Sequence, residues 1–294
     1  MSAEMKNFEL PLGLERFRSQ FEATIKPYIE IQTHVTREVN PWQSKFAGFP
    51  YLPKNFDYPK TPEGEYLYLL AQINFEKVPH LEGFPEKGIL QFYISERGDG
   101  FGCDFENPTI QTGFRVLYFP EPDLNEDHLL TDFSFLPTFW ARNHNPFRIS
   151  RSSPPDKKDC FALTFKLKYS PITTADFKFD KLIGEEIWEA CEENFCEEND
   201  CENNGCLLWE EYHNRFEKGH RLGGYPFFSQ NDPRELLAEE ADQYILLLQI
   251  DSEGKTTDSI QIIWGDVGRC NFFIQESALR NLDFSSVLYN WDCG

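Results

Sequence analysis

The 294-residue sequence predicts an α+β fold in which β-structure predominates, with mostly antiparallel sheets and a few peripheral helices. Two observations predict this class. Short runs of aromatic and β-branched residues recur between segments rich in turn-forming residues, as in antiparallel β-proteins. In addition, residues 69–74 (LLAQIN) recur as residues 246–251 (LLLQID), each an apolar run with one isolated glutamine. We therefore expect an internally duplicated core.

The segments that flank this repeated motif are repeated in the same order. Residues 45–50 (KFAGFP) correspond to residues 221–226 (RLGGYP), and both precede the motif. Residues 92–96 (FYISE) correspond to residues 272–276 (FFIQE), and both follow it. A retained order of several blocks is typical of an internal duplication.

The domain organisation follows from this repeat. We predict one domain over residues 1–294, with pseudo-repeat halves at roughly residues 40–120 and 215–294. The middle segment between them contains an acidic piece at residues 184–218 that is predicted to be helical.

The chain begins with a predicted helix. Its apolar face repeats at three- and four-residue spacing and comprises Leu10, Leu14, Phe17, Phe21 and Ile25. Pro27 is expected to end this helix, and alternating apolar residues then predict a strand over residues 29–35. Residues 40–66 are dense in proline and glycine but carry large aromatic residues, so we expect an ordered loop; a flexible linker is the alternative.

Most of the remaining regular structure is predicted to be strand. The expected strands are residues 66–74, 88–95, 114–119, 160–169, 243–251, 259–264, 270–275 and 286–291. Helices are expected at residues 184–197 and 207–218, and a short one from Ala278, capped by Ser277.

The charge of the chain excludes some classes of function. The formal net charge is -21, from 49 acidic and 28 basic residues. Nucleic-acid binding needs clustered lysine and arginine, and anionic lipid would be repelled, so neither partner is expected. No segment approaches the about 18 apolar residues of a membrane helix, and the N-terminus lacks the apolar stretch of a signal peptide. We therefore expect a cytoplasmic protein whose eight cysteines are reduced.

Several motifs in the chain resemble those of a known family. They are residues 42–48 (WQSKFAG), 69–75 (LLAQINF), 88–92 (GILQF), 223–226 (GGYP), 264–266 (WGD) and 289–293 (YNWDC). In this order they resemble the YwqG-like family, a bacterial domain of unknown function, over nearly the whole chain. The resemblance implies one β-rich domain with an internally duplicated core, and it supplies no catalytic residues. The cysteine- and asparagine-rich piece around Asp200 departs from the family pattern.

The repeated glutamines are the first candidate site. Alternation along a strand places Gln72 beside Asn74 on one face, and Gln249 beside Asp251. One interpretation is structural, since buried amides must find hydrogen-bond partners in neighbouring loops. The other is a ligand site formed by both copies across a cleft. The ligand-binding residues predicted on this interpretation are Lys45, Gln72, Asn74, Arg221, Gln249, Asp251, Trp264 and Asp266. Residues 264–268 are otherwise expected to be a tight turn between two strands.

The acidic segment is the second candidate. Its cysteines, spaced five apart, do not form the C-x-x-C pattern of zinc sites. Its oxygen ligands fit positions 1, 3, 5 and 12 of an EF-hand loop, and they are Asp200, Glu202, Asn204 and Glu211. The sequence therefore raises calcium as a possible cofactor, against the alternative of a solvated helix face.

No standard catalytic motif occurs in the chain, and its six histidines share no local pattern. We therefore predict a binding protein that recognises a protein partner or a small ligand between its duplicated halves. Its acidity would suit a basic partner. One alternative is a hydrolase-like enzyme that uses Asp251 or Asp266 with Gln72 and Gln249. A second alternative is a calcium-responsive protein that binds through residues 200–211.

Overall fold

The computed structural model describes residues 8–96, 100–137, 145–149, 159–188, 204–254 and 260–294. Their centre is a ten-stranded sheet in which all neighbouring strands run antiparallel. From edge to edge its strands are β12 (Leu288–Asp292), β11 (Arg269–Gln275), β9 (Tyr244–Asp251), β8 (His220–Gly223), β1 (Lys26–Thr36), β7 (Cys160–Ser170), β2 (Lys45–Ala47), β3 (Tyr68–Asn74), β4 (Ile89–Ile94) and β5 (Phe114–Phe119). Strands β6 (Phe147–Ile149) and β10 (Ile260–Ile262) form a separate antiparallel pair. The predicted β-rich, antiparallel fold is confirmed.

The helices are short and lie outside the sheet. They are η2 (Leu12–Phe17), α1 (Arg18–Thr24), η3 (Phe75–Lys77), η4 (Glu126–His128), α2 (Phe179–Ile183), α4 (Asn204–Tyr212), the π-helical turn η6 (His213–Glu217), η7 (Pro233–Gln243) and α5 (Glu276–Arg280). None of the helices in the described part of the chain has the length and apolar character needed to cross a membrane.

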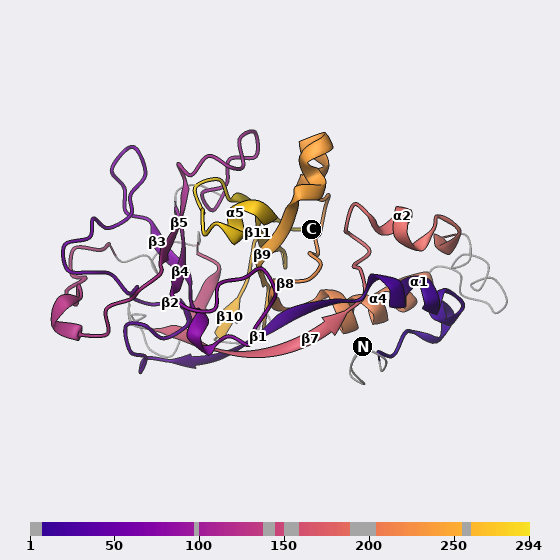
Figure 1. Ribbon diagram of the computed structural model, residues 1–294, viewed down its shortest axis with the longest axis horizontal. Helices are drawn as coiled ribbons and strands as arrows, with labels where there is room; N and C mark the ends of the chain where they lie inside the picture. The colour runs from indigo at the N-terminus through magenta and orange to yellow at the C-terminus, as the bar shows by residue number, and fades with distance from the viewer. Residues whose placement is uncertain (1–7, 97–99, 138–144, 150–158, 189–203, 255–259) are drawn as a thin grey trace.

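The two longest strands hold the molecule together. Strands β1 and β7 pair along eleven residues, from Lys26 opposite Ser170 to Thr36 opposite Cys160. In Figure 1 they run along the lower side of the molecule, between strands β2 to β5 on the left and helices α1, α2 and α4 on the right. Strand β1 also pairs with β8, and β7 also pairs with β2. The two long strands together therefore join one half of the sheet, β8 to β12, to the other half, β2 to β5.

The two ends of the sheet pack against each other. The ring centroid of Phe92 in β4 lies 4.8 Å from that of Phe272 in β11, and Phe114 in β5 lies 5.2 Å from Tyr289 in β12. The backbone N–H of Tyr289 also donates to the carbonyl of Pro108 at 2.9 Å. The sheet therefore curls around one large apolar core, in which these rings are almost fully buried.

The first predicted helix is confirmed as η2 followed by α1. Four of the five predicted apolar residues pack into a second core, where Phe21 lies 6.2 Å from Phe179 of α2 and 5.3 Å from Tyr212 of α4; the fifth, Ile25, follows the end of α1 and is outside this core. The spacing of apolar residues indicated this correctly because one helical face must bury them together. Residues 40–66 are ordered as predicted, since Phe46 and Tyr51 are buried, but they are not all loop, because they include strand β2; the linker alternative is wrong.

The structure corrects the predictions from the sequence in two respects. The expected short helix begins at Glu276 rather than Ala278, and its N-cap, Gln275, makes no side-chain capping bond, so Ser277 is not the cap. Strands β2, β6 and β8 were not predicted, because three or four residues are too few to show alternation and pairing with neighbours defines them. Of the helix expected at residues 184–197, residues 186–188 are helical, and residues 189–197 lie outside the described ranges.

Candidate functional site

Gln72 in β3 is fully buried and ties the preceding loop to the sheet. Its Oε1 accepts from the backbone N–H of Tyr51 at 2.7 Å and from Nε2 of Gln91 at 2.8 Å. Its Nε2 donates to the carbonyls of Pro41 at 2.8 Å and Gln43 at 2.9 Å. These four bonds use both donors and both acceptor positions of the amide.

Gln249 in β9 makes the corresponding set of contacts in the second half. Its Oε1 accepts from the backbone N–H of Phe227 at 2.8 Å. Its Nε2 donates to the carbonyl of Gly219 at 2.8 Å and to that of Glu217 at 3.3 Å. On the adjacent strand, Asn271 Nδ2 donates to the carbonyl of Phe227 at 3.1 Å, so the loop after β8 is also held to the sheet.

A cation lies opposite each glutamine. Lys45 in β2 pairs with Gln72, and Arg221 in β8 pairs with Gln249. Both cations are almost fully buried and are held by backbone carbonyls. Burial lowers the pKa of Lys45 to about 8, because the charged ammonium loses its hydration.

The remaining polar residues of the two clusters are also engaged. Asn74 donates from Nδ2 to the carbonyl of Trp42 at 3.1 Å. The carboxylate of Asp251 accepts from the backbone N–H of Gly219 at 2.8 Å and from Nε of Arg269 at 3.1 Å. The structure therefore brings together three of the predicted residues in each half, while β1 and β7 lie between the two clusters in the sheet. That the clusters form one ligand cleft stays a prediction.

The other two predicted ligand residues lie in and beside the expected turn. Trp264 is fully buried, with its ring 5.2 Å from Phe101, and its carbonyl accepts from the N–H of Gly268 at 2.7 Å. Asp266 is exposed at the tip of this turn, which joins β10 to β11. Asp251 is paired with Arg269, and the hydrolase-like alternative stays a prediction.

The predicted calcium ligands are described only in part. Asp200 and Glu202 lie outside the described residues, Asn204 begins α4, and Glu211 in the same helix pairs with Arg215. Within the described ranges, no group of three or more histidine, cysteine or acidic residues is placed to hold a metal ion. Calcium binding stays a prediction, which calcium titration of the wild-type chain and of Glu211→Gln, followed by thermal melting, would test.

A buried carboxyl was not singled out in the sequence. Glu217 in η6 is fully buried, and burial raises its pKa to about 7. Its Oε2 lies 3.0 Å from Nδ1 of His213, whose pKa burial lowers to about 4. The local sequence carries no signal for this, because Glu217 stands in a polar run and only the packing of the π-helical turn buries it.

A groove lies between β5 and the segment 282–285. It has a volume of about 550 Å³, and a neighbouring depression of about 470 Å³ shares the walls formed by Tyr118, Pro120 and Leu282. The side chain of Gln111 connects the two sides of the groove. Its Nε2 donates to the carbonyl of Phe284 at 2.7 Å, and its Oε1 accepts from the N–H of Val116 at 2.8 Å. These walls come from both predicted halves of the chain.

Arg115 gives the groove an unbalanced positive charge. Among the described residues no carboxylate pairs with it, and its Nε is buried without a hydrogen-bond partner. One of its terminal nitrogens donates to the carbonyl of Gln111 at 3.2 Å. A guanidinium has five N–H donors, so several remain for a ligand.

Strand β5 is an edge of the sheet. In the described part of the chain it pairs with β4 and with no strand on its other side. The N–H of Ser95 donates to the carbonyl of Gly113, so alternation turns the backbone groups of Val116 and Tyr118 away from β4. Gln111 already occupies the N–H of Val116, which leaves Tyr118 to offer its N–H and carbonyl outward.

The comparisons with known proteins give a family and no activity. The model of one family, described as a domain of unknown function (DUF1963), matches residues 44–293. The matched range runs from β2 to β12 and includes both glutamine clusters and the groove. No curated protein matches the chain.

Proposed function

Because this chain belongs to the DUF1963 family, whose function is unknown, we propose a function from its geometry. The protein is a binding protein that takes up an extended segment of a partner protein along the edge of β5. The groove beside this edge carries the proposal, since it joins an outward-facing backbone to an apolar wall formed by Tyr118, Leu282 and Phe284.

The shape of the groove suits an extended chain. The two depressions share three wall residues and so continue into each other along the edge strand. Backbone hydrogen bonds to Tyr118 would supply affinity, and alternate side chains of the bound segment would enter the depressions. Arg115 offers charge-assisted donors to a carboxylate or carbonyl of that segment.

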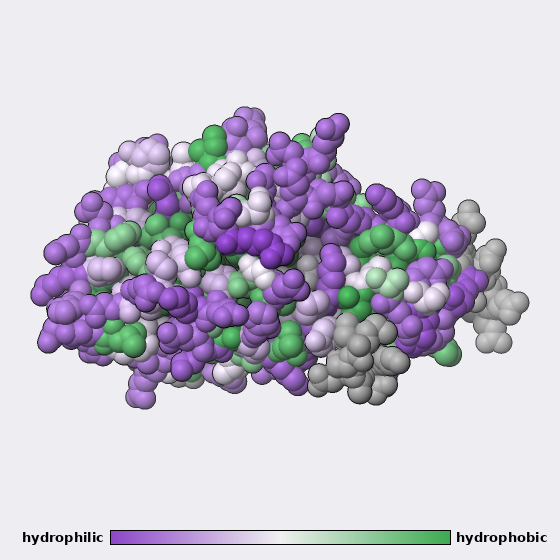
Figure 2. All heavy atoms as spheres, in the orientation of Figure 1, coloured by the Kyte–Doolittle hydropathy of each residue, from purple (hydrophilic) through white to green (hydrophobic). Residues whose placement is uncertain are grey.

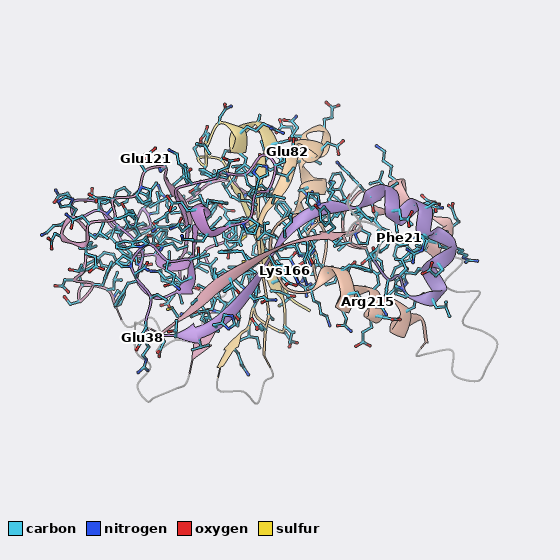
Figure 3. The ribbon with its side chains drawn as sticks, turned by 60° about the horizontal axis from the view of Figure 1, so that its bottom comes forward. Phe21, Glu38, Glu82, Glu121, Lys166 and Arg215 are labelled. Carbon is cyan, nitrogen blue, oxygen red and sulfur yellow. The ribbon has the colours of Figure 1, made fainter. Side chains whose placement is uncertain are left out.

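The charge of the whole molecule supports a partner that is basic outside the bound segment. The net charge is -21, and Figure 2 shows hydrophilic residues over most of the visible face. In Figure 3, Glu82 and Glu121 project from the same side of the molecule, and both side chains are exposed. Such a surface speeds encounter with a basic protein through electrostatic steering.

We further propose that the core arose by internal duplication. The support comes from matching contacts in the two halves. Each glutamine lies opposite a cation on a short strand, β2 or β8. Its side-chain oxygen accepts from a backbone N–H in the loop after that strand, and its side-chain nitrogen donates to a carbonyl in the loop before it. The strand pairing also shifts register at the equivalent residues Leu70 and Leu247. The sequence motifs that resemble the YwqG-like family support a YwqG-like member of DUF1963, and the charge and the N-terminal sequence favour a cytoplasmic location.

A peptide-binding experiment with matched variants tests the proposed function. Peptides selected from a random library on the wild-type chain would be titrated against Leu282→Glu and, as a control, Leu12→Glu. Both leucines are exposed, but Leu282 lines the groove and Leu12 lies on η2. We expect at least about tenfold weaker binding to Leu282→Glu and unchanged binding to Leu12→Glu.

Hydrogen exchange supplies a second readout. The amide of Tyr118 should exchange more slowly in the complex, because the bound segment would accept a hydrogen bond from it. Equal binding by both variants, failure to select any peptide, or unchanged exchange along β5 would each contradict binding at this edge.

A further inference from the structure

A second pocket lies beside β2, away from the walls of the groove, and it has a different chemical character. Its volume is about 250 Å³. Its walls include the apolar side chains of Pro41, Phe49, Leu130 and Phe133 and the cationic ones of Arg37 and Lys45. Phe49 and Phe133 stack with their ring centroids 4.6 Å apart, so this part of the wall is preformed.

One of the two positive charges around this pocket is not offset by a negative charge within the described part of the chain. Arg37 pairs with the buried carboxylate of Asp159, which offsets its charge. Lys45 donates from Nζ to the carbonyls of Pro41 at 3.2 Å and Asn40 at 3.5 Å, and among the described residues no carboxylate pairs with it. Burial raises the pKa of the nearby Cys160 thiol to about 11, so this thiol is neutral at physiological pH and does not offset the ammonium.

The corresponding cation in the second half, Arg221, has three carbonyl partners and an acidic residue near it. Arg221 donates to the carbonyls of Phe216, Lys218 and Tyr225. The carboxylate of Asp251, which is paired with Arg269, also acts on it electrostatically. The chain itself thus supplies the groups that surround the guanidinium of Arg221.

The first half lacks these acidic groups. Asn74, which is neutral, stands at the strand position that corresponds to Asp251, and Pro41 stands at the position that corresponds to Glu217. Among the described residues, Lys45 has two carbonyl partners, although an ammonium has three N–H donors. Lys45 and Pro41 both line the pocket, so a ligand carboxylate bound there would lie beside the ammonium.

We propose that this pocket binds a small organic monocarboxylate, whose carboxylate pairs with Lys45 and whose apolar body contacts Phe49, Leu130 and Phe133. The third N–H of the ammonium then finds a charge-assisted acceptor. The apolar walls remove the body of the ligand from water, and the acid supplies the negative charge that the chain omits.

Paired acids and amides test this proposal on the full chain. Acetate, isovalerate and benzoate, each beside its neutral amide, would be titrated by calorimetry and by ligand-observed NMR. Removing the charge of the ligand removes the pairing with Lys45, so at least one acid should bind saturably and about tenfold more tightly than its amide. An equal affinity for acid and amide, or no saturable binding of any acid, would overturn the proposal.

Matched variants locate the site. Lys45→Met should abolish the preference for the acid, and Lys45→Arg should retain part of it. Lys166→Met is the control, because Lys166 is an exposed residue midway along β7, as Figure 3 shows. If Lys45→Met fails to fold, Thr131→Trp fills the pocket from its exposed rim and should abolish binding. An acid preference that survives either change would place the ligand elsewhere.

The pH dependence separates this lysine from an ordinary one. Because the pKa of Lys45 is lowered to about 8, the preference for the acid should fall between pH 7 and 9, where exposed lysines keep their charge. Of the groups near it, Cys160 has a pKa that burial raises to about 11, above this range, and Arg37 is paired with Asp159. A preference that is constant from pH 7 to 9 would contradict pairing with Lys45.

Discussion

At the scale of single residues, the structure favours the structural interpretation of the repeated glutamines. Gln72 replaces the hydrogen bonds that three loop residues, Pro41, Gln43 and Tyr51, would make to water. A loop without regular structure needs such partners, because its buried backbone groups have no strand or helix to satisfy them.

Replacing this amide should destabilise the fold. Gln72→Ala leaves several buried donors and acceptors unpaired, so we expect a loss of about 2–3 kcal/mol or more in the free energy of unfolding. Gln32→Ala is the control, since Gln32 is exposed on β1, and its effect should stay within about 0.5 kcal/mol. Denaturant melts of the two variants give the comparison; equal stabilities would contradict the structural role.

The buried carboxyl of Glu217 predicts a pH effect of definite sign. Its pKa is raised to about 7 in the folded chain and is about 4.5 when unfolded. Between about pH 4.5 and 7 the carboxyl of Glu217 is therefore mostly protonated in the folded chain and mostly ionised in the unfolded chain. The free energy of unfolding consequently falls as pH rises through this range. The fall amounts to about 3 kcal/mol in total, from about 1.4 kcal/mol per pKa unit.

The test uses the neutral isostere Glu217→Gln. Relative to wild type, this variant should gain stability as pH rises from about 4.5 to 7, and the gain should level off above pH 7. A difference in unfolding free energy that does not change with pH would refute the buried-carboxyl assignment.

At the scale of elements, the short strands β2 and β8 end alike. The backbone is left-handed at Ala47, with φ 59°, and at Gly223, with φ 67°, so the chain leaves both strands through the same kind of backbone conformation. Gly223 avoids the cost of a Cβ in this conformation, whereas Ala47 bears it. A Cβ at Gly223 would also lie 2.8 Å from Cδ2 of Leu81.

Exchanging these residues gives a matched pair of variants. Gly223→Ala should destabilise the fold by about 1–2 kcal/mol, through left-handed strain and the contact with Leu81. Ala47→Gly should change stability by less than about 1 kcal/mol, because relief of strain offsets the greater freedom of the unfolded chain. Thermal melts would measure both, and a Gly223→Ala chain as stable as wild type would contradict the argument.

At the scale of the whole molecule, the two halves depend on each other. Strand β1 lies between β7 and β8, and β7 lies between β1 and β2, so each half completes its sheet with a strand from outside it. The curled ends add the packing of Phe272 on Tyr289, with ring centroids 4.5 Å apart. We therefore expect that neither half keeps a closed core without the other.

This dependence predicts one cooperative unfolding transition. Tryptophan fluorescence and far-ultraviolet circular dichroism should give the same midpoint, and a fragment of residues 1–150, which lacks β7, should not fold. Phe272→Ala should lower the single midpoint seen by both probes, with a cost of about 3–5 kcal/mol. Two separate transitions, or a folded fragment, would show independent halves.

The sequence by itself determined the longer elements and their type. Alternating or continuous apolar runs of six or more residues predict β3, β4, β5, β7, β9 and β11, because burial against a core requires that pattern. It also predicted that Gln72 and Gln249 occupy equivalent positions, since each is an isolated amide in one of two similar apolar runs.

The tertiary structure alone decided the rest. Strands β2 and β8 exist because longer strands flank them, and the groove exists because segment 282–285 reaches β5 from far along the chain. The burial of Lys45 and Glu217, which shifts their pKa values, likewise depends on which loops cover them. Local sequence fixes periodicity, whereas desolvation and pairing are set by neighbours that only the folded chain brings together.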